Sequence, residues 1–136
     1  MNVLLLEDGL LGRDLSTLLR HFINMAFPAS KCEIILIDSV WEAVDVIDIS
    51  PQDAFDFVVS DGTRWEGVYT AAIEKFGRER VVVYSGDSSL VWRLRDDSTV
   101  DAYIKSARAG VGDAWKTPAE LANVVAQKLK DLAPNS

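Results

Sequence analysis

The chain has 136 residues, of which 49% are apolar and 26% are charged, so it can form one compact domain with a sizeable core. Its 21 acidic side chains outnumber 14 basic ones and give a net charge of -7, which disfavours direct contact with nucleic acid or acidic membranes. One cysteine and one histidine exclude an intramolecular disulfide and most zinc chemistry. We therefore expect residues 1–136 to form a single domain whose chemistry rests on carboxylates, hydroxyls and lysine.

Short β-branched runs alternate along the chain with apolar residues at helical spacing. The runs predict strands at residues 3–6, 33–37, 55–59, 80–84 and 100–104. The helical patterns predict helices at residues 10–23, 41–49, 68–76, 88–97 and 118–132, the third of them short. Thr117 and Pro118 form a typical helix start, an N-cap residue followed by proline at the first helical position.

Strands that alternate with helices indicate parallel pairing, because parallel strands need crossover connections. Residues 34–37 and 81–83 are continuously apolar, which is typical of strands that are buried on both faces. The sequence thus predicts an α/β fold, a doubly wound five-stranded parallel sheet in a flavodoxin-like three-layer sandwich. No apolar run approaches the length of a membrane span and no targeting segment is evident, so we expect a cytoplasmic protein without membrane insertion.

Polar residues follow the predicted strands at the edge where ligands bind in such sheets, namely Glu7, Asp8, Asp61, Ser85 and Lys105. Each alone is a common turn or edge residue. Together they place three carboxylates, a hydroxyl and an ammonium at one edge, a set that suits a hard oxygen-binding cation and a phosphoryl group. The combination predicts phosphoryl transfer.

These residues and their positions resemble the receiver domains of two-component response regulators, over nearly the whole chain. The resemblance implies that Glu7 and Asp8 bind Mg²⁺ together with Asp61 and the backbone carbonyl of Thr63. It further implies that Asp61 accepts the phosphoryl group, that Ser85 is the switch hydroxyl and that Lys105 contacts the phosphoryl oxygens. The donor would be a histidine kinase or a histidine phosphotransfer protein, and the signal would pass to a downstream protein rather than directly to nucleic acid.

The sequence departs from the family pattern in several places, among them Ser106 in place of a proline after Lys105 and a longer stretch at residues 107–115. Residues 62–67 read Gly-Thr-Arg-Trp-Glu-Gly in place of the family's methionine–proline pair, and Ala102 stands where an aromatic residue usually precedes the lysine by three positions. Because side chains alternate along a strand, Tyr103 cannot simply substitute for that aromatic. We therefore expect residues 86–90 to carry the response to phosphorylation.

The sequence leaves two alternatives open. A pseudo-receiver would keep the fold but act by phosphate-independent protein contacts. A Mg²⁺-dependent aspartyl phosphohydrolase is the other, yet that chemistry usually needs a second aspartate two residues after the nucleophile, where this chain has Leu10 or Thr63. We expect a signalling domain that gains and loses its own phosphoryl group rather than a turnover enzyme.

Overall fold

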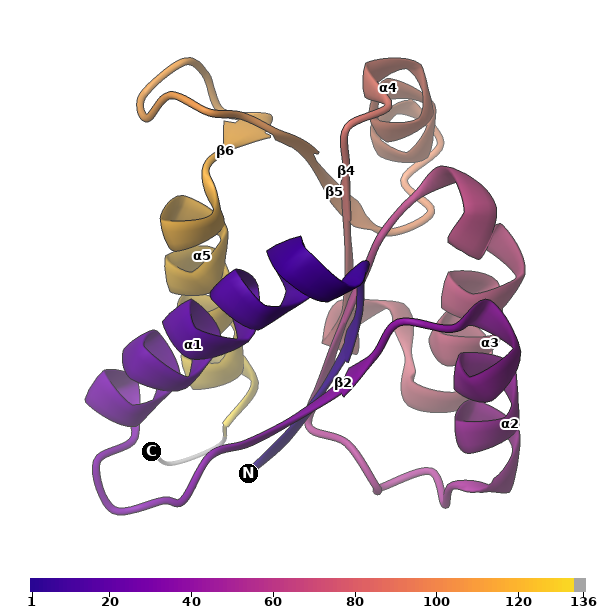
Figure 1. Ribbon diagram of the computed structural model, residues 1–136, viewed down its shortest axis with the longest axis vertical. Helices are drawn as coiled ribbons and strands as arrows, with labels where there is room; N and C mark the ends of the chain where they lie inside the picture. The colour runs from indigo at the N-terminus through magenta and orange to yellow at the C-terminus, as the bar shows by residue number, and fades with distance from the viewer. Residues whose placement is uncertain (134–136) are drawn as a thin grey trace.

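The computed structural model describes residues 1–133 (Figure 1). Its strands are β1 (Asn2–Leu6), β2 (Glu33–Ile37), β3 (Phe57–Ser60), β4 (Val81–Ser85), β5 (Asp101–Lys105) and β6 (Trp115–Lys116). Its helices are α1 (Gly9–Ala26), α2 (Val40–Ile49), α3 (Glu66–Phe76), α4 (Ser88–Asp96) and α5 (Pro118–Leu132), with 3₁₀ turns at Thr63–Trp65 and Arg78–Arg80.

The strands form one parallel sheet in the order β2-β1-β3-β4-β5-β6. Helices α1 and α5 cover one face of this sheet, and α2, α3 and α4 cover the other (Figure 1). The α/β class, the parallel pairing and the three layers agree with the prediction. Strands β1, β3 and β4 lie inside the sheet with both faces covered, which explains why their sequences are apolar without alternation. The same expectation is wrong for residues 34–37, because β2 is an edge strand and Ile35 is 40% exposed.

The predicted number of five strands is wrong, because the described residues form six. The loop 106–114 returns the chain to the outer edge of β5, where Ile104 N donates to Ala114 O at 2.7 Å and Ser106 N donates to Lys116 O at 3.0 Å. The Tyr84 hydroxyl also donates to Lys116 O at 2.7 Å, and so ties β6 to β4. β6 has only two residues, too few to show a strand periodicity in the sequence.

Several element bounds also differ from the prediction. β3 begins at Phe57, because Phe55 and Asp56 precede the ladder, and β4 and β5 each begin and end one residue later than expected. Ser85 and Lys105 are consequently the last residues of their strands instead of the first residues of the following loops. Helix α3 begins at Glu66, directly after a 3₁₀ turn, and is longer than the short helix expected at 68–76.

Register places the candidate residues at one edge of the sheet. Leu6 pairs with both Ile37 and Ser60, so Glu7 and Asp61 leave neighbouring strands at the same level. Asp61 N also donates to Leu6 O at 2.7 Å, which continues the β1–β3 pairing as far as the site. None of the helices within residues 1–133 combines the length and the apolar character needed to cross a bilayer.

Candidate functional site

The carboxyl ends of β1, β3 and β5 bring Glu7, Asp8, Asp61 and Lys105 together. The three acidic residues each offer a carboxylate oxygen, and these oxygens lie within 4.8 Å of one another. They differ in exposure: Glu7 is buried, Asp61 is half-buried and Asp8 is exposed. The cluster therefore opens to solvent on the Asp8 side and is closed beneath Glu7.

Lys105 bridges two of the carboxylates. Its Nζ lies 3.1 Å from Oε1 of Glu7 and 3.0 Å from Oδ1 of Asp61, and it donates a hydrogen bond to each. The side chain crosses above β4, where Nζ lies 5.8 Å from the centre of the Tyr84 ring. Tyr84 is fully buried and fixed by its bond to Lys116 O, so it supports the stem of Lys105 from below.

Burial strongly changes the chemistry of Glu7. Only 1% of its surface is exposed, and burial raises its pKa to about 7, although the Lys105 ammonium acts in the opposite direction. The nearby Asp61 carboxylate also raises the pKa of Glu7, because two negative charges in one cleft repel each other. A cation at the cluster would favour the charged form of Glu7 and so lower its pKa.

Asp8 makes a weaker contact across the mouth of the site. Its Oδ1 lies 3.5 Å from Nη2 of Arg64, and both side chains are largely exposed, so the ion pair contributes little to stability. Arg64 comes from the 3₁₀ turn that follows Asp61. The loop after Asp61 thus supplies a second cation to the cluster, which the sequence analysis did not anticipate.

The arrangement meets the chemical requirements of a Mg²⁺ site. Hard oxygen ligands are present in the three carboxylates, and Mg²⁺ sites in proteins use one or two of these with water. Glu7 Oε2 is buried and accepts no hydrogen bond from residues 1–133, although Lys105 Nζ lies 3.1 Å away. A buried carboxylate oxygen that lacks a hydrogen-bond donor fits a cation ligand. A role for the Thr63 carbonyl stays a prediction.

Ser85 is close to the site but does not contact its carboxylates. Its buried hydroxyl accepts a hydrogen bond from Asp87 N at 3.0 Å and points toward Gly62. A Cβ added to Gly62 would lie 2.2 Å from Ser85 Oγ, so only glycine fits at this position. The backbone of Gly62 in turn donates to Asp61 Oδ1 at 2.7 Å, which orients the carboxylate.

Two further side chains near the site have surroundings that the sequence analysis did not anticipate. Trp65 is fully buried, and its Nε1 has no hydrogen-bond partner in the described part of the chain. Asp87 caps α4 by accepting from Leu90 N at 3.1 Å, and it also accepts from the Thr63 hydroxyl at 3.1 Å. The cap could have been predicted, because an aspartate directly before Ser-Ser-Leu is a typical N-cap. The contact with Thr63 could not.

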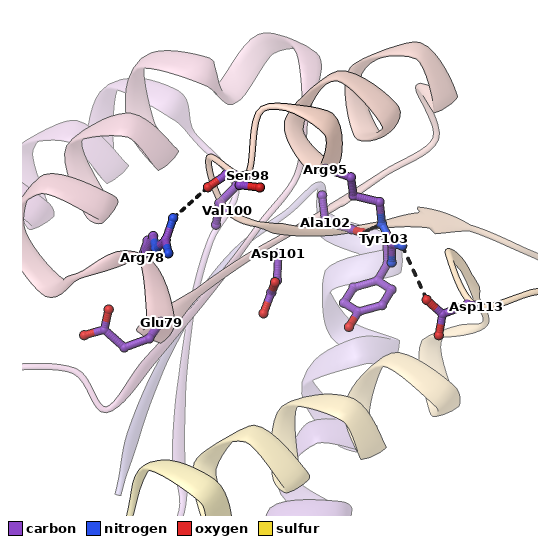
Figure 2. Close-up of a pocket in the computed structure, with 9 residues that line it drawn as sticks. All are labelled: Arg78, Glu79, Arg95, Ser98, Val100, Asp101, Ala102, Tyr103 and Asp113. Atoms are coloured by element: carbon purple, nitrogen blue, oxygen red, sulfur yellow. Dashed lines mark hydrogen bonds and ion pairs between the residues drawn. The ribbon is translucent and has the colours of Figure 1, made fainter.

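Ala102 and Tyr103 point to opposite faces of β5, as expected from alternation. Ala102 packs with the α2, α3 and α4 side, whereas Tyr103 packs on the α1 and α5 side. Tyr103 lines a hollow of about 630 Å³ beside β5, and none of the residues that line this hollow belongs to the acidic cluster. Figure 2 shows Tyr103 among the other residues of this lining. Arg95 lies 4.9 Å from the Tyr103 ring and donates to Ala102 O, so this ring is held by contacts remote from Ser85.

No known family profile matches the sequence, and no curated protein matches it. A search of solved structures finds the crystal structure of HP1043, an orphan response regulator of H. pylori, with a TM-score of 0.62 and 18% sequence identity. The match covers 95% of this chain and 96% of the other. At this identity the likeness concerns the fold alone: the chain shares the fold of that structure, which agrees with the resemblance to receiver domains.

Proposed function

We propose that this protein is a response-regulator receiver that accepts a phosphoryl group on Asp61 in a Mg²⁺-dependent reaction. The observation that carries the proposal is the position of Lys105, whose Nζ lies 3.0 Å from Asp61 and 3.1 Å from Glu7. An ammonium among three carboxylates at one sheet edge has a specific use in phosphoryl transfer, where charge spreads over the phosphoryl oxygens. The receiver fold supports the same conclusion.

In the proposed reaction an oxygen of Asp61 bonds to phosphorus while the phosphorus–nitrogen bond of a phosphohistidine breaks. The nitrogen leaves with the electron pair and takes a proton, and Asp61 becomes an acyl phosphate. Lys105 and Gly62 N both donate to Oδ1, and no group within residues 1–133 donates to Oδ2. Oδ2 is therefore the oxygen that is available as the nucleophile.

Glu7, Asp8 and Asp61 would hold Mg²⁺, with the Thr63 carbonyl as a further ligand. The bound ion would neutralise charge on the phosphoryl oxygens. Lys105 approaches from the β5 side and would bind a phosphoryl oxygen after its contact with Asp61 is released. Ser85 would bind another of these oxygens once its hydroxyl has left Asp87 N.

The protein would act as a signalling domain in the cytoplasm, and water would remove its phosphoryl group. The donor would be a histidine kinase or a histidine phosphotransfer protein, and a downstream protein would receive the signal. The net charge of -7 is unfavourable for direct contact with nucleic acid.

A phosphate-independent pseudo-receiver is the second candidate. The observation in its favour is that Lys105 and Arg64 already pair with the three carboxylates of the cluster, so two of the three negative charges are offset without a metal. An aspartyl phosphohydrolase has less support, because Thr63 and Leu10 occupy the positions where its general acid would stand.

Intact mass spectrometry after incubation with Mg²⁺ and acetyl phosphate tests the proposal. We expect a gain of roughly 80 Da, the mass of one phosphoryl group, in the wild type and in Asp45→Asn, an exposed control on α2. Asp61→Asn should show no gain. A gain that persists in Asp61→Asn would assign the acceptor to another residue, and a wild type that gains nothing from several small donors would favour the pseudo-receiver.

A further inference from the structure

The loop after Asp61 is joined directly to the start of α4 by one side chain. Asp87 uses its two carboxylate oxygens for different partners: Oδ1 accepts from Leu90 N at 3.1 Å and Oδ2 accepts from the Thr63 hydroxyl at 3.1 Å. The first bond caps the helix, as an N-cap aspartate commonly does. The second is a long-range contact, because Thr63 and Asp87 are 24 residues apart in the sequence.

The Ser85 hydroxyl lies between the two segments that this contact joins. On one side it accepts from Asp87 N at 3.0 Å. On the other side it packs against Gly62, where an added Cβ would lie 2.2 Å from Ser85 Oγ and 2.8 Å from Leu90 Cδ2. A movement of the Asp87 backbone away from Thr63 would thus change the surroundings of Ser85 on the Asp87 side.

We infer that Thr63 and Asp87 form a latch that holds Ser85 in its resting position, and that the latch opens when Ser85 turns toward a group on Asp61. The second half of this inference rests on the proposed function, whereas the first half concerns the unmodified protein. Asp87 is a positioning residue in this scheme, since it acts through the Ser85 hydroxyl and does not touch the acidic cluster.

The latch gives the protein a route for its signal that needs no aromatic ring next to Lys105. Ala102 has no ring, and Tyr103 is held on the opposite face of β5 by Arg95. In contrast, the Thr63–Asp87 bond links the acceptor loop to the first turn of α4 through two side chains. Release of the Thr63 bond frees the 86–90 segment, in which Gly86 lies between the switch hydroxyl and the cap.

Amide hydrogen exchange measured by NMR in the unmodified protein tests the resting latch. In Thr63→Val the hydroxyl is lost and the shape is kept, and we expect the Asp87 and Leu90 amides to exchange about threefold to tenfold faster, the effect of one exposed hydrogen bond. Thr63→Ser, which keeps the hydroxyl, should exchange like the wild type. Thr17→Val on α1 is a matched control and should leave both amides unchanged.

A second variant separates the latch from the helix cap. Asp87→Ser keeps a capping oxygen, but its side chain is too short to reach Thr63. We therefore expect the backbone amides at positions 87 and 90 to exchange faster than in the wild type, as they do in Thr63→Val. The double variant should be no faster than the faster single variant, because both changes remove the same bond. Equal exchange in Thr63→Val and the wild type, or fully additive effects in the double variant, would overturn the latch.

Beryllium trifluoride with Mg²⁺, a phosphoryl mimic, tests the opening. We expect the mimic to shift the amides of residues 61–63 and to raise Asp87 exchange in the wild type to the level of Thr63→Val. Shifted 61–63 amides with unchanged Asp87 exchange would refute the opening. If the mimic shifts nothing in any variant, the proposed function fails, while the comparison of Thr63→Val with Thr63→Ser still decides whether the latch exists.

Discussion

Glu7 shows at the scale of one residue how burial changes the chemistry of a carboxylate. It lies directly after a fully buried strand, and its own surface is 1% exposed. Burial raises its pKa to about 7, against the attraction of Lys105. Neighbouring Asp8 leaves the same strand one residue later and is exposed, so two adjacent acids of similar chemistry have different environments.

The raised pKa of Glu7 predicts a pH-dependent stability in the metal-free protein. An acid whose pKa is higher in the folded state than in the unfolded state stabilises the fold at low pH, and this contribution is lost as the pH rises from about 4.5 to about 7. Glu7→Gln is always neutral, so relative to the wild type it should gain roughly 1–3 kcal/mol of stability between pH 5 and pH 8. Urea unfolding with a chelator measures this difference.

The exposed Glu74→Gln serves as the control, because its side chain lies on the surface of α3, and it should show no such pH-dependent gain. A constant difference between Glu7→Gln and the wild type at both pH values would contradict the raised pKa.

At the scale of an element, single side chains stabilise the first and last turns of helices. Thr117 and Glu120 form a reciprocal capping box at the start of α5, with bonds of 3.2 and 2.9 Å. At the end of α2 the Lys75 ammonium donates to the carbonyls of Ile47, Asp48 and Ser50 at 2.6, 2.8 and 2.7 Å. Lys75 belongs to α3, so it satisfies the last turn of its neighbour and joins the two helices.

Lys75→Met should destabilise the protein by about 1–2 kcal/mol, because it removes three charge-assisted hydrogen bonds and leaves carbonyl groups at the end of α2 to water. Lys130→Met on the exposed side of α5 is the matched control and should change stability by less than about 0.5 kcal/mol. Chemical unfolding followed by circular dichroism gives both values. A loss in Lys75→Met no larger than in the control would show that water satisfies these carbonyls equally well.

At the scale of the whole molecule the charge distribution makes the fold responsive to cations. The net charge is -7, and three carboxylates meet at one edge of the sheet. Within residues 1–133 two cationic side chains, Lys105 and Arg64, form ion pairs with these carboxylates. The metal-free protein therefore contains unfavourable repulsion that a divalent ion would relieve. A ligand that binds only the folded state also raises the stability of the entire domain.

We expect Mg²⁺ to raise the thermal midpoint of the wild type relative to a sample with chelator. Asp8→Asn should weaken this response, since it removes a ligand, and should raise the midpoint of the metal-free protein, since it removes a repelling charge. Differential scanning calorimetry at constant ionic strength measures both effects. Asp45→Asn has the same change of charge far from the cluster and should keep the full Mg²⁺ response; an undiminished response in Asp8→Asn would remove that residue from the metal site.

The sequence by itself determined the class of the fold and the residues at its functional edge. Continuous apolar runs such as 81–83 predict strands buried on both faces, and a parallel sheet aligns the carboxyl ends of its strands. Glu7, Asp61 and Lys105 could therefore be assigned to one edge of the sheet from the sequence alone. These inferences succeed because they depend on local periodicity and on one general property of parallel sheets.

Only the tertiary structure decided the contacts between residues far apart in the chain. β6 is a strand because the loop 106–114 brings Trp115 and Lys116 to β5, and two residues carry no periodicity that predicts this. The burial of Glu7 beside an exposed Asp8, and the bond between Thr63 and Asp87, likewise depend on how loops meet above the sheet. Side-chain pairing across loops is set by packing geometry, which the order of the residues does not reveal.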